Sequence, residues 1–211
     1  MKRFDLWRLA ALAMAVSLPT FTSCTGKKVQ ALLEPSVALG RVLAEDAMQA
    51  AGTKKQITII SPDSSWGPAS TVEEAFKAAL KSKGFSAVTA KAANLGDPMR
   101  FGTVGLMAPD FAEALEKSGA AGAVVSFAGG PLFWQSESAR LNLPHPPVFV
   151  VATATLGNVP GVPTDHRQLQ AMLDAGLIQL AIIDGSEPQA AKADAAHELF
   201  AQNFRRLRKA D

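Results

Sequence analysis

Polar side chains follow three of the short apolar segments of this chain. The segment 57–60 leads into Asp63, Ser64, Ser65 and Trp66. Ser126 lies near the end of the segment 122–127, and Asp184 follows the segment 177–183. Carboxylate and hydroxyl groups can orient a small polar ligand by hydrogen bonding, and an indole ring offers it an apolar face. Because Asp and Ser are also common turn residues, a local structural role is the alternative for each of these side chains.

Serine-type hydrolysis is a second chemistry to consider. Ser126 or Ser64 would be the nucleophile, with a distant base from His145, His166 or His197. The glycines of a G-x-S-x-G elbow are missing around Ser126, no two histidines have the i, i+4 spacing of a helical zinc site, and no P-loop sequence occurs. The sequence therefore predicts no catalytic residue, no metal and no cofactor, and it favours a binding protein over an enzyme.

The elements that would position these side chains alternate along the chain. Apolar runs at 57–60, 86–88, 122–127, 148–151 and 177–183 predict strands, and most of them are continuous, as expected for strands covered on both faces. Amphipathic patterns between the strands predict helices. The alternation predicts an α/β fold: a three-layer sandwich with a mainly parallel sheet of about five strands, like flavodoxin. In such a sheet, ligands bind beyond the carboxyl ends of the strands.

Five helices are expected, and several have recognisable ends. The first spans about 36–51. The second begins at Ser70, which forms a capping box with Glu73, and ends at Gly84. The third begins at Pro109 and ends at Gly119, and the fourth is capped by Thr164 and ends at Gly176. The last spans about 188–208, and the segment 128–146 is expected to hold a short helix and a Pro-rich loop.

The N-terminal segment has the layout of a secretory signal. Lys2, Arg3 and Arg8 precede an uncharged apolar run at 9–18, which is too short to cross a bilayer, since that takes roughly 20 residues. The one cysteine, Cys24, follows this run. It has no second cysteine for a disulfide within the chain and no nearby base to activate a thiol. Simple secretion and a structural cysteine are the alternatives to an attachment point.

The stretch Phe21-Thr22-Ser23-Cys24 resembles the lipobox of bacterial lipoproteins, with Phe21 in place of the usual Leu. The resemblance implies a signal peptide at 1–23, lipidation of Cys24 (palmitate among the acyl groups), a tether at 24–34, and a protein anchored in the bacterial cell envelope and facing the periplasm. Removal of 23 residues from 211 leaves 188, with 18 basic and 18 acidic side chains. A neutral chain without a basic stripe gives no reason to expect nucleic-acid binding.

The remaining chain, 35–211, is expected to form one domain. Its stretches "ITIISPDSSWGPAS", "FAEALEKSGAAGAVVSFAGG" and "PPVFVVATA" resemble one lobe of a type I periplasmic binding protein. The resemblance implies ligand contacts from Ser64, Ser65, Trp66 and Ser126, although members of that family close two lobes around their ligand. We therefore expect recognition of a small polar solute. The alternatives are an interaction lipoprotein that docks another envelope protein, and the serine-type hydrolase.

Overall fold

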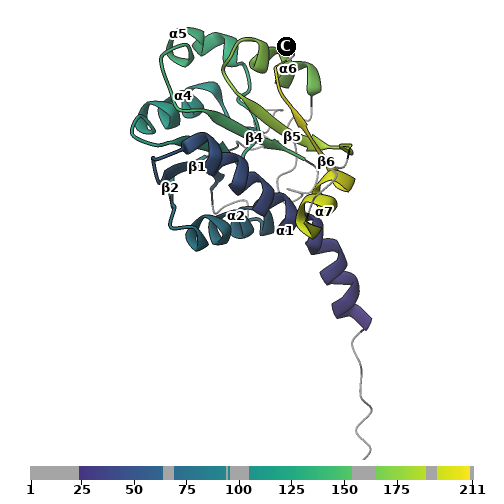
Figure 1. Ribbon diagram of the computed structural model, residues 1–211. Coiled ribbons are helices and arrows are strands. Elements are labelled where there is room, and N and C mark those ends of the chain that lie inside the picture. The colour runs from purple at the N-terminus through teal and green to yellow at the C-terminus, as the bar shows by residue number, and fades with distance from the viewer. Residues whose placement is uncertain are drawn as a thin grey trace, which may run out of the picture.

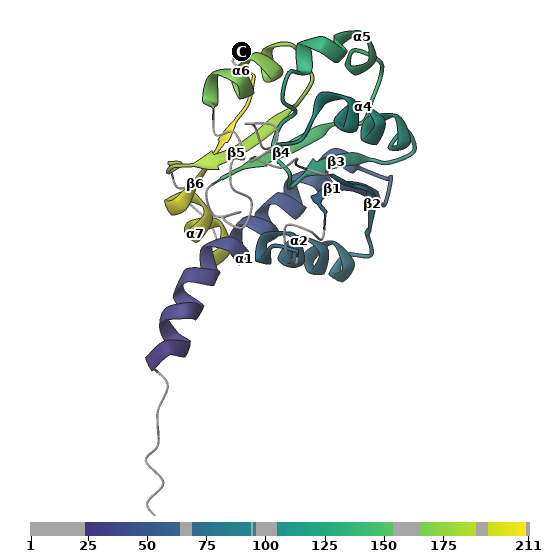
Figure 2. The same ribbon diagram turned by 180° about the vertical axis from the view of Figure 1, so that it is seen from behind.

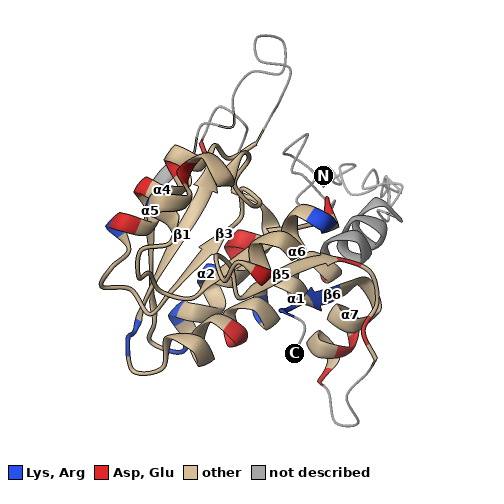
Figure 3. Cartoon of the chain, turned by 90° about the horizontal axis from the view of Figure 1, so that it is seen from above, with Lys and Arg blue, Asp and Glu red and all other residues tan. Residues whose placement is uncertain are grey.

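A computed structural model describes residues 24–63, 69–93, 95, 105–153, 165–188 and 194–209. A central sheet lies between two layers of helices, one above and one below the strands in Figure 1, and the view from behind shows the same two layers (Figure 2). The predicted α/β class and three-layer arrangement are confirmed within these residues. Lys and Arg are interspersed with Asp and Glu on the helices rather than gathered in one stripe (Figure 3).

The sheet has six described strands. They are β1 (Gln56–Pro62), β2 (Ser86–Ala93), β3 (Ala123–Ser126), β4 (Val148–Ala152), β5 (Leu180–Asp184) and β6 (Phe204–Leu207). Their order is β2-β1-β3-β4-β5-β6; the first five are parallel and β6 is antiparallel to β5. The five predicted strands are present. The runs in β1, β3, β4 and β5 are continuous because these strands are buried, whereas β2 is an edge strand on which Val88 is exposed.

The helices divide between the two faces of the sheet. α1 (Cys24–Ala51), α2 (Thr71–Ser82) and α7 (Ala195–Asn203) share one buried apolar cluster with the sheet. α4 (Ala108–Lys117), α5 (Ser138–Leu141) and α6 (His166–Asp174) share the other. A 3-10 helix, η2 (Trp134–Glu137), precedes α5. Strand residues alternate between the clusters: Val125 belongs to the first and Val124 to the second.

Most predicted helix ends agree with the structure. The Ser70 hydroxyl accepts a hydrogen bond from the Glu73 backbone N–H at the start of α2, and Gly84, with φ of 74°, follows its last turn. α6 is capped by Asp165, which accepts from the Arg167 N–H, so the predicted cap at the preceding residue, Thr164, is wrong by one position.

The last predicted helix is corrected. α7 ends at Asn203, and the chain then forms β6, so the sheet has a sixth strand that was expected to be helix. Phe200 and Phe204 lie one helical turn apart in sequence and both are buried, so their spacing fits a helix as well. Instead, the chain at Phe204 pairs with Asp184 and covers the outer edge of β5. Pairing at the edge of a sheet depends on tertiary contacts, so it cannot be predicted from the spacing of hydrophobic residues.

Helix α1 is longer than predicted. It begins at Cys24 rather than near residue 36, so the segment expected to be a tether is helical, and Pro35 lies inside the helix. The N-terminal half of α1 extends beyond the body of the domain (Figure 1). Of the helices in the described ranges, none has the length and apolar character needed to cross a membrane.

A close approach fixes α1 against α2. A Cβ added at Gly40 would lie 2.4 Å from the Val72 carbonyl oxygen and 2.8 Å from the Phe76 nitrogen. Only glycine leaves room for the α2 backbone here. Gly40 therefore sets the position of α1 on the domain.

Candidate functional site

The strand order reverses between β1 and β3. From β1 the chain crosses to β2 on one side and, after β2, to β3 on the other side. Parallel strands end at the same edge of the sheet, and in open α/β sheets the crevice beside such a reversal is where ligands bind. The candidate site is therefore the carboxyl edge of β1 and β3, which we call the switch edge.

Of the predicted residues, Asp63 lies at the switch edge. It directly follows β1, is partly exposed, and already takes part in an interaction within the protein. β1 continues two residues past Ile60, which pairs with the last residue of β3, so Asp63 stands beyond the end of β3. Ser64, Ser65 and Trp66 lie outside the described residues.

Ser126 ends β3, but its side chain is turned inward. It is fully buried, and its hydroxyl donates to the Gly129 carbonyl oxygen at 2.6 Å. Gly129 has a φ of 78°, a conformation that favours glycine, so the hydroxyl and the glycine together shape the turn that leaves β3. No hydrogen bond joins Ser126 to a histidine among the described residues. Here the hydroxyl supports the loop.

Asp184 ends β5 and is exposed. Its side chain or backbone already takes part in an interaction within the protein. Because β3 and β4 separate β5 from β1, and neighbouring strands lie about 4.8 Å apart, Asp184 is roughly 14 Å from β1 across the sheet. The structure therefore does not bring Asp184 together with Asp63.

A buried carboxylate holds the two ends of the loop after β1. Glu73, in the first turn of α2, accepts a hydrogen bond from the Ser61 hydroxyl at 2.7 Å and from Lys77 at 2.5 Å, and its side chain is 3% exposed. The sequence predicted that Glu73 would bond back to the helix cap. Instead it joins the end of β1 to α2 and so fixes the two described ends of the segment between them.

The sequence reasoning also missed Phe133, which lies in the loop between β3 and η2. It is 60% exposed, and its backbone has φ of 54° and ψ of 33°. Neither property has a signal in the sequence, because a Phe after Gly-Pro-Leu fits a buried position equally well.

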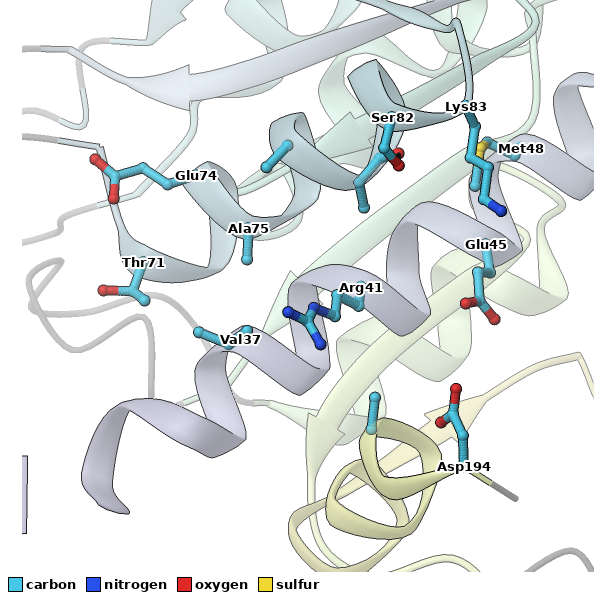
Figure 4. Close-up of a pocket in the computed structure, with 13 residues that line it drawn as sticks. Val37, Arg41, Glu45, Met48, Thr71, Glu74, Ala75, Ser82, Lys83 and Asp194 are labelled. Atoms are coloured by element: carbon cyan, nitrogen blue, oxygen red, sulfur yellow. Dashed lines mark hydrogen bonds between the residues drawn. The ribbon is translucent and has the colours of Figure 1, made fainter. Parts of the chain in front are cut away.

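A groove lies elsewhere, on the outer surface of α1 and α2 and at the start of α7. It has a volume of about 670 Å³. Arg41 points into it between the helices (Figure 4), and Glu45 and Asp194 flank it near α7. On the α2 side, small side chains such as Ala75 and Ala78 line it together with Glu74 and Lys83. The groove therefore combines small apolar side chains with charges of both signs.

His197 joins α1 to the start of α7 beside this groove. Its Nε2 lies 3.1 Å from Glu45 and its Nδ1 lies 2.8 Å from Asp194. The backbone N–H of His197 and then its side chain hold the pKa of Asp194 below its ordinary value by hydrogen bonding. In the described ranges, no three His, Cys, Asp or Glu side chains are grouped so that they could hold a metal ion.

Comparison of the chain with models of protein families, with curated proteins and with solved structures finds no match.

Proposed function

We propose that the chain is a lipoprotein of the bacterial envelope whose domain recognises a small polar ligand at the switch edge, facing the periplasm. The observation that carries the proposal is the reversal of strand order between β1 and β3, next to a loop rich in hydrogen-bonding side chains. The order β2-β1-β3-β4-β5 also supports a flavodoxin-like assignment of the domain, to which β6 is an antiparallel addition.

Asp63, Ser64, Ser65 and Trp66 are the proposed ligand contacts, and Glu73 is a positioning residue. The loop that carries the contacts starts near Ser61 and ends at α2, and Glu73 bonds the Ser61 hydroxyl from within α2. A loop with fixed ends loses less conformational entropy when it binds a ligand. Ser126 belongs to the proposed site as the residue that shapes the neighbouring loop, and Asp184 belongs to a separate position on the same edge.

The proposed anchor is Cys24, at the start of α1. From Cys24 to Pro35 the helix spans about 17 Å at 1.5 Å per residue. An anchor at the end of this projecting helix would hold the domain away from the bilayer. Mass spectrometry of the native protein should find a chain that begins at an acylated Cys24, and Cys24→Ala should leave the precursor unprocessed. An unmodified native chain that begins elsewhere would contradict the anchor.

The binding proposal is tested by ligand-dependent stability. The processed protein is extracted in detergent, and its thermal unfolding is followed by circular dichroism with a panel of amino acids, organic acids, sugars and nucleosides. A solute at 100 times its Kd stabilises the folded state by about 2.7 kcal/mol. Asp63→Asn should raise the Kd of the stabilising solute at least tenfold. Asp184→Asn, three strands away, should change this Kd by no more than about twofold. No stabilisation by any solute would overturn the proposal.

The groove on α1 and α2 supports a second candidate function, the docking of another envelope protein. Its length along α1, from Val37 to Met48, corresponds to about three helical turns, and small side chains on α2 allow a close approach. The occupant that fits is one amphipathic helix with an acidic side chain opposite Arg41. Ala78→Trp, which fills the groove at an exposed position, should abolish binding of the partner's purified helix, and Ala139→Trp on α5 is the matched control. Equal affinities for both variants would contradict docking in the groove.

A further inference from the structure

We propose that Phe133 is a ligand contact at the switch edge, where its ring stacks on a planar ring of the ligand. This inference rests on the proposed function and narrows it: the ligand is a small polar molecule that contains an aromatic or heteroaromatic ring.

The first observation is the backbone conformation of Phe133. Its φ of 54° and ψ of 33° lie in the left-handed region, and it is the one non-glycine residue with positive φ in the described part of the chain. A residue with a Cβ is disfavoured there by roughly tenfold or more relative to its usual conformations. For a bulky residue this is a genuine outlier.

Burial does not compensate for this conformation. Phe133 is 60% exposed and is the most exposed of the large hydrophobic residues in the described ranges. The next residue carries a second cost, because the Trp134 indole Nε1 is buried without a hydrogen-bond partner among the described atoms. Uncompensated costs of this kind concentrate at functional sites, where the surrounding structure holds them in place.

The surrounding backbone fixes Phe133 on both sides. The Leu132 N–H donates to the Leu106 carbonyl at 2.7 Å, in a parallel bridge that pairs Leu132 with Met107. The Phe133 carbonyl accepts two hydrogen bonds from Ser136, from its N–H at 2.9 Å and its hydroxyl at 2.8 Å. A ring on such a fixed backbone is preorganised, so little entropy is lost when it contacts a ligand.

The position of Phe133 agrees with a role in binding. The chain leaves β3 at Ser126 and reaches Phe133 within seven residues, next to the start of α4, where Met107 is the helix cap. The start of α4 and the end of β3 both lie at the carboxyl edge of the parallel strands. Met107 is 38% exposed and adds a polarisable side chain to the same region. Together they offer the edge of the sheet a surface suited to a flat ring.

The experiment pairs stability with ligand choice. Phe133→Asn removes the ring and introduces asparagine, a residue that tolerates the left-handed conformation. Leu143→Asn is the matched control, because Leu143 is 56% exposed and its backbone does not have positive φ. Both variants are compared with the wild-type processed protein in detergent, using adenosine, tryptophan and nicotinate as ring-bearing probes, and glutamate, succinate and serine as probes without a ring.

We expect Phe133→Asn to raise the Tm by about 3–6 °C, the shift that corresponds to a tenfold relief of strain in a domain of this size, and to weaken binding of the ring-bearing probe at least tenfold. Leu143→Asn should neither raise the Tm nor weaken binding of the ring-bearing probe. A variant that is stabilised yet fails to bind marks a residue kept for binding rather than for folding.

Three results would overturn the inference. If a probe without a ring binds and Phe133→Asn retains its affinity, the role of Phe133 is wrong while the proposed function stands. If ring-bearing probes bind with equal affinity to the variant and the wild-type protein, Phe133 is not the contact. If none of the six probes changes the Tm of the wild-type protein, both this inference and the binding of these ligand classes fail.

Discussion

Replacement of Gly40 by alanine tests how α1 is seated on the domain. The new Cβ would lie 2.4 Å from the Val72 oxygen, 2.8 Å from the Ala75 Cβ and 2.8 Å from the Phe76 nitrogen. A carbon and a carbonyl oxygen normally approach to about 3.3–3.6 Å, so the helices must separate by about 1 Å. The obstructing atoms belong to the backbone or to a Cβ, and no change of side-chain rotamer can move them away.

The change in the free energy of unfolding is the difference between a packing cost and a gain in helix propensity. Overpacking of a well-packed contact costs about 1–3 kcal/mol. Alanine in place of glycine inside a helix returns roughly 1 kcal/mol. Because backbone atoms obstruct the new Cβ on α2, the packing cost should lie near its upper limit, and Gly40→Ala should lower the free energy of unfolding by about 1–2 kcal/mol.

Urea unfolding followed by circular dichroism measures this change as a lower midpoint with an unchanged m value. Gly119→Ala is the matched control, because its nearest neighbour would be 3.9 Å from the new Cβ and its φ is not positive. This control should not destabilise the protein. If Gly40→Ala is as stable as the wild-type protein, α1 and α2 do not approach each other as described, and the groove between them loses its geometry.

Three further predictions concern charged side chains. Glu73→Ala should cost about 2 kcal/mol in urea unfolding, because its carboxylate is buried, whereas Glu113→Ala breaks an ion pair of similar length at the surface and should cost less than about 0.5 kcal/mol; equal losses would contradict the role of burial. Arg206→Lys should destabilise the protein by about 1 kcal/mol, because the lysine cannot bond the two carboxylates that the guanidinium reaches at 2.8 and 2.9 Å; an unchanged midpoint would contradict this. The hydrogen bonds that lower the pKa of Asp194 stabilise the folded protein when the carboxylate is ionised, so their contribution is present at neutral pH and is lost as the pH falls below about 4. The free energies of unfolding of Asp194→Ala and the wild-type protein should therefore differ at neutral pH and converge in acid. A constant difference down to pH 2 would refute this prediction.

The sequence was sufficient for the elements that are buried on both sides. The continuous runs around Ile57, Val124 and Val150 identify strands because a parallel sheet has no solvent face on which polar residues could alternate. The cap at Ser70 could be predicted because it depends on residues three positions apart. These features are local in the chain, or they reflect burial alone.

What could not be predicted depends on contacts between distant segments. The turn from α7 into β6 is set by pairing with β5, and the Arg206 guanidinium that holds β6 bonds Asp46 on α1, 160 residues away. For the candidate site, the sequence could place Asp63 and Ser126 at the ends of strands. It could not show that the Ser126 hydroxyl turns inward, or that Glu73 reaches Ser61, because both depend on side-chain directions in the folded state.

Amide hydrogen exchange of the processed protein, with and without a solute that stabilises it, tests the central claim most directly. We predict slower exchange at the ends of β1 and β3, at 61–63 and 126–130, with smaller changes at the groove residues of α1 and α2. Protection confined to α1 and α2 would contradict binding at the switch edge and would favour the groove instead.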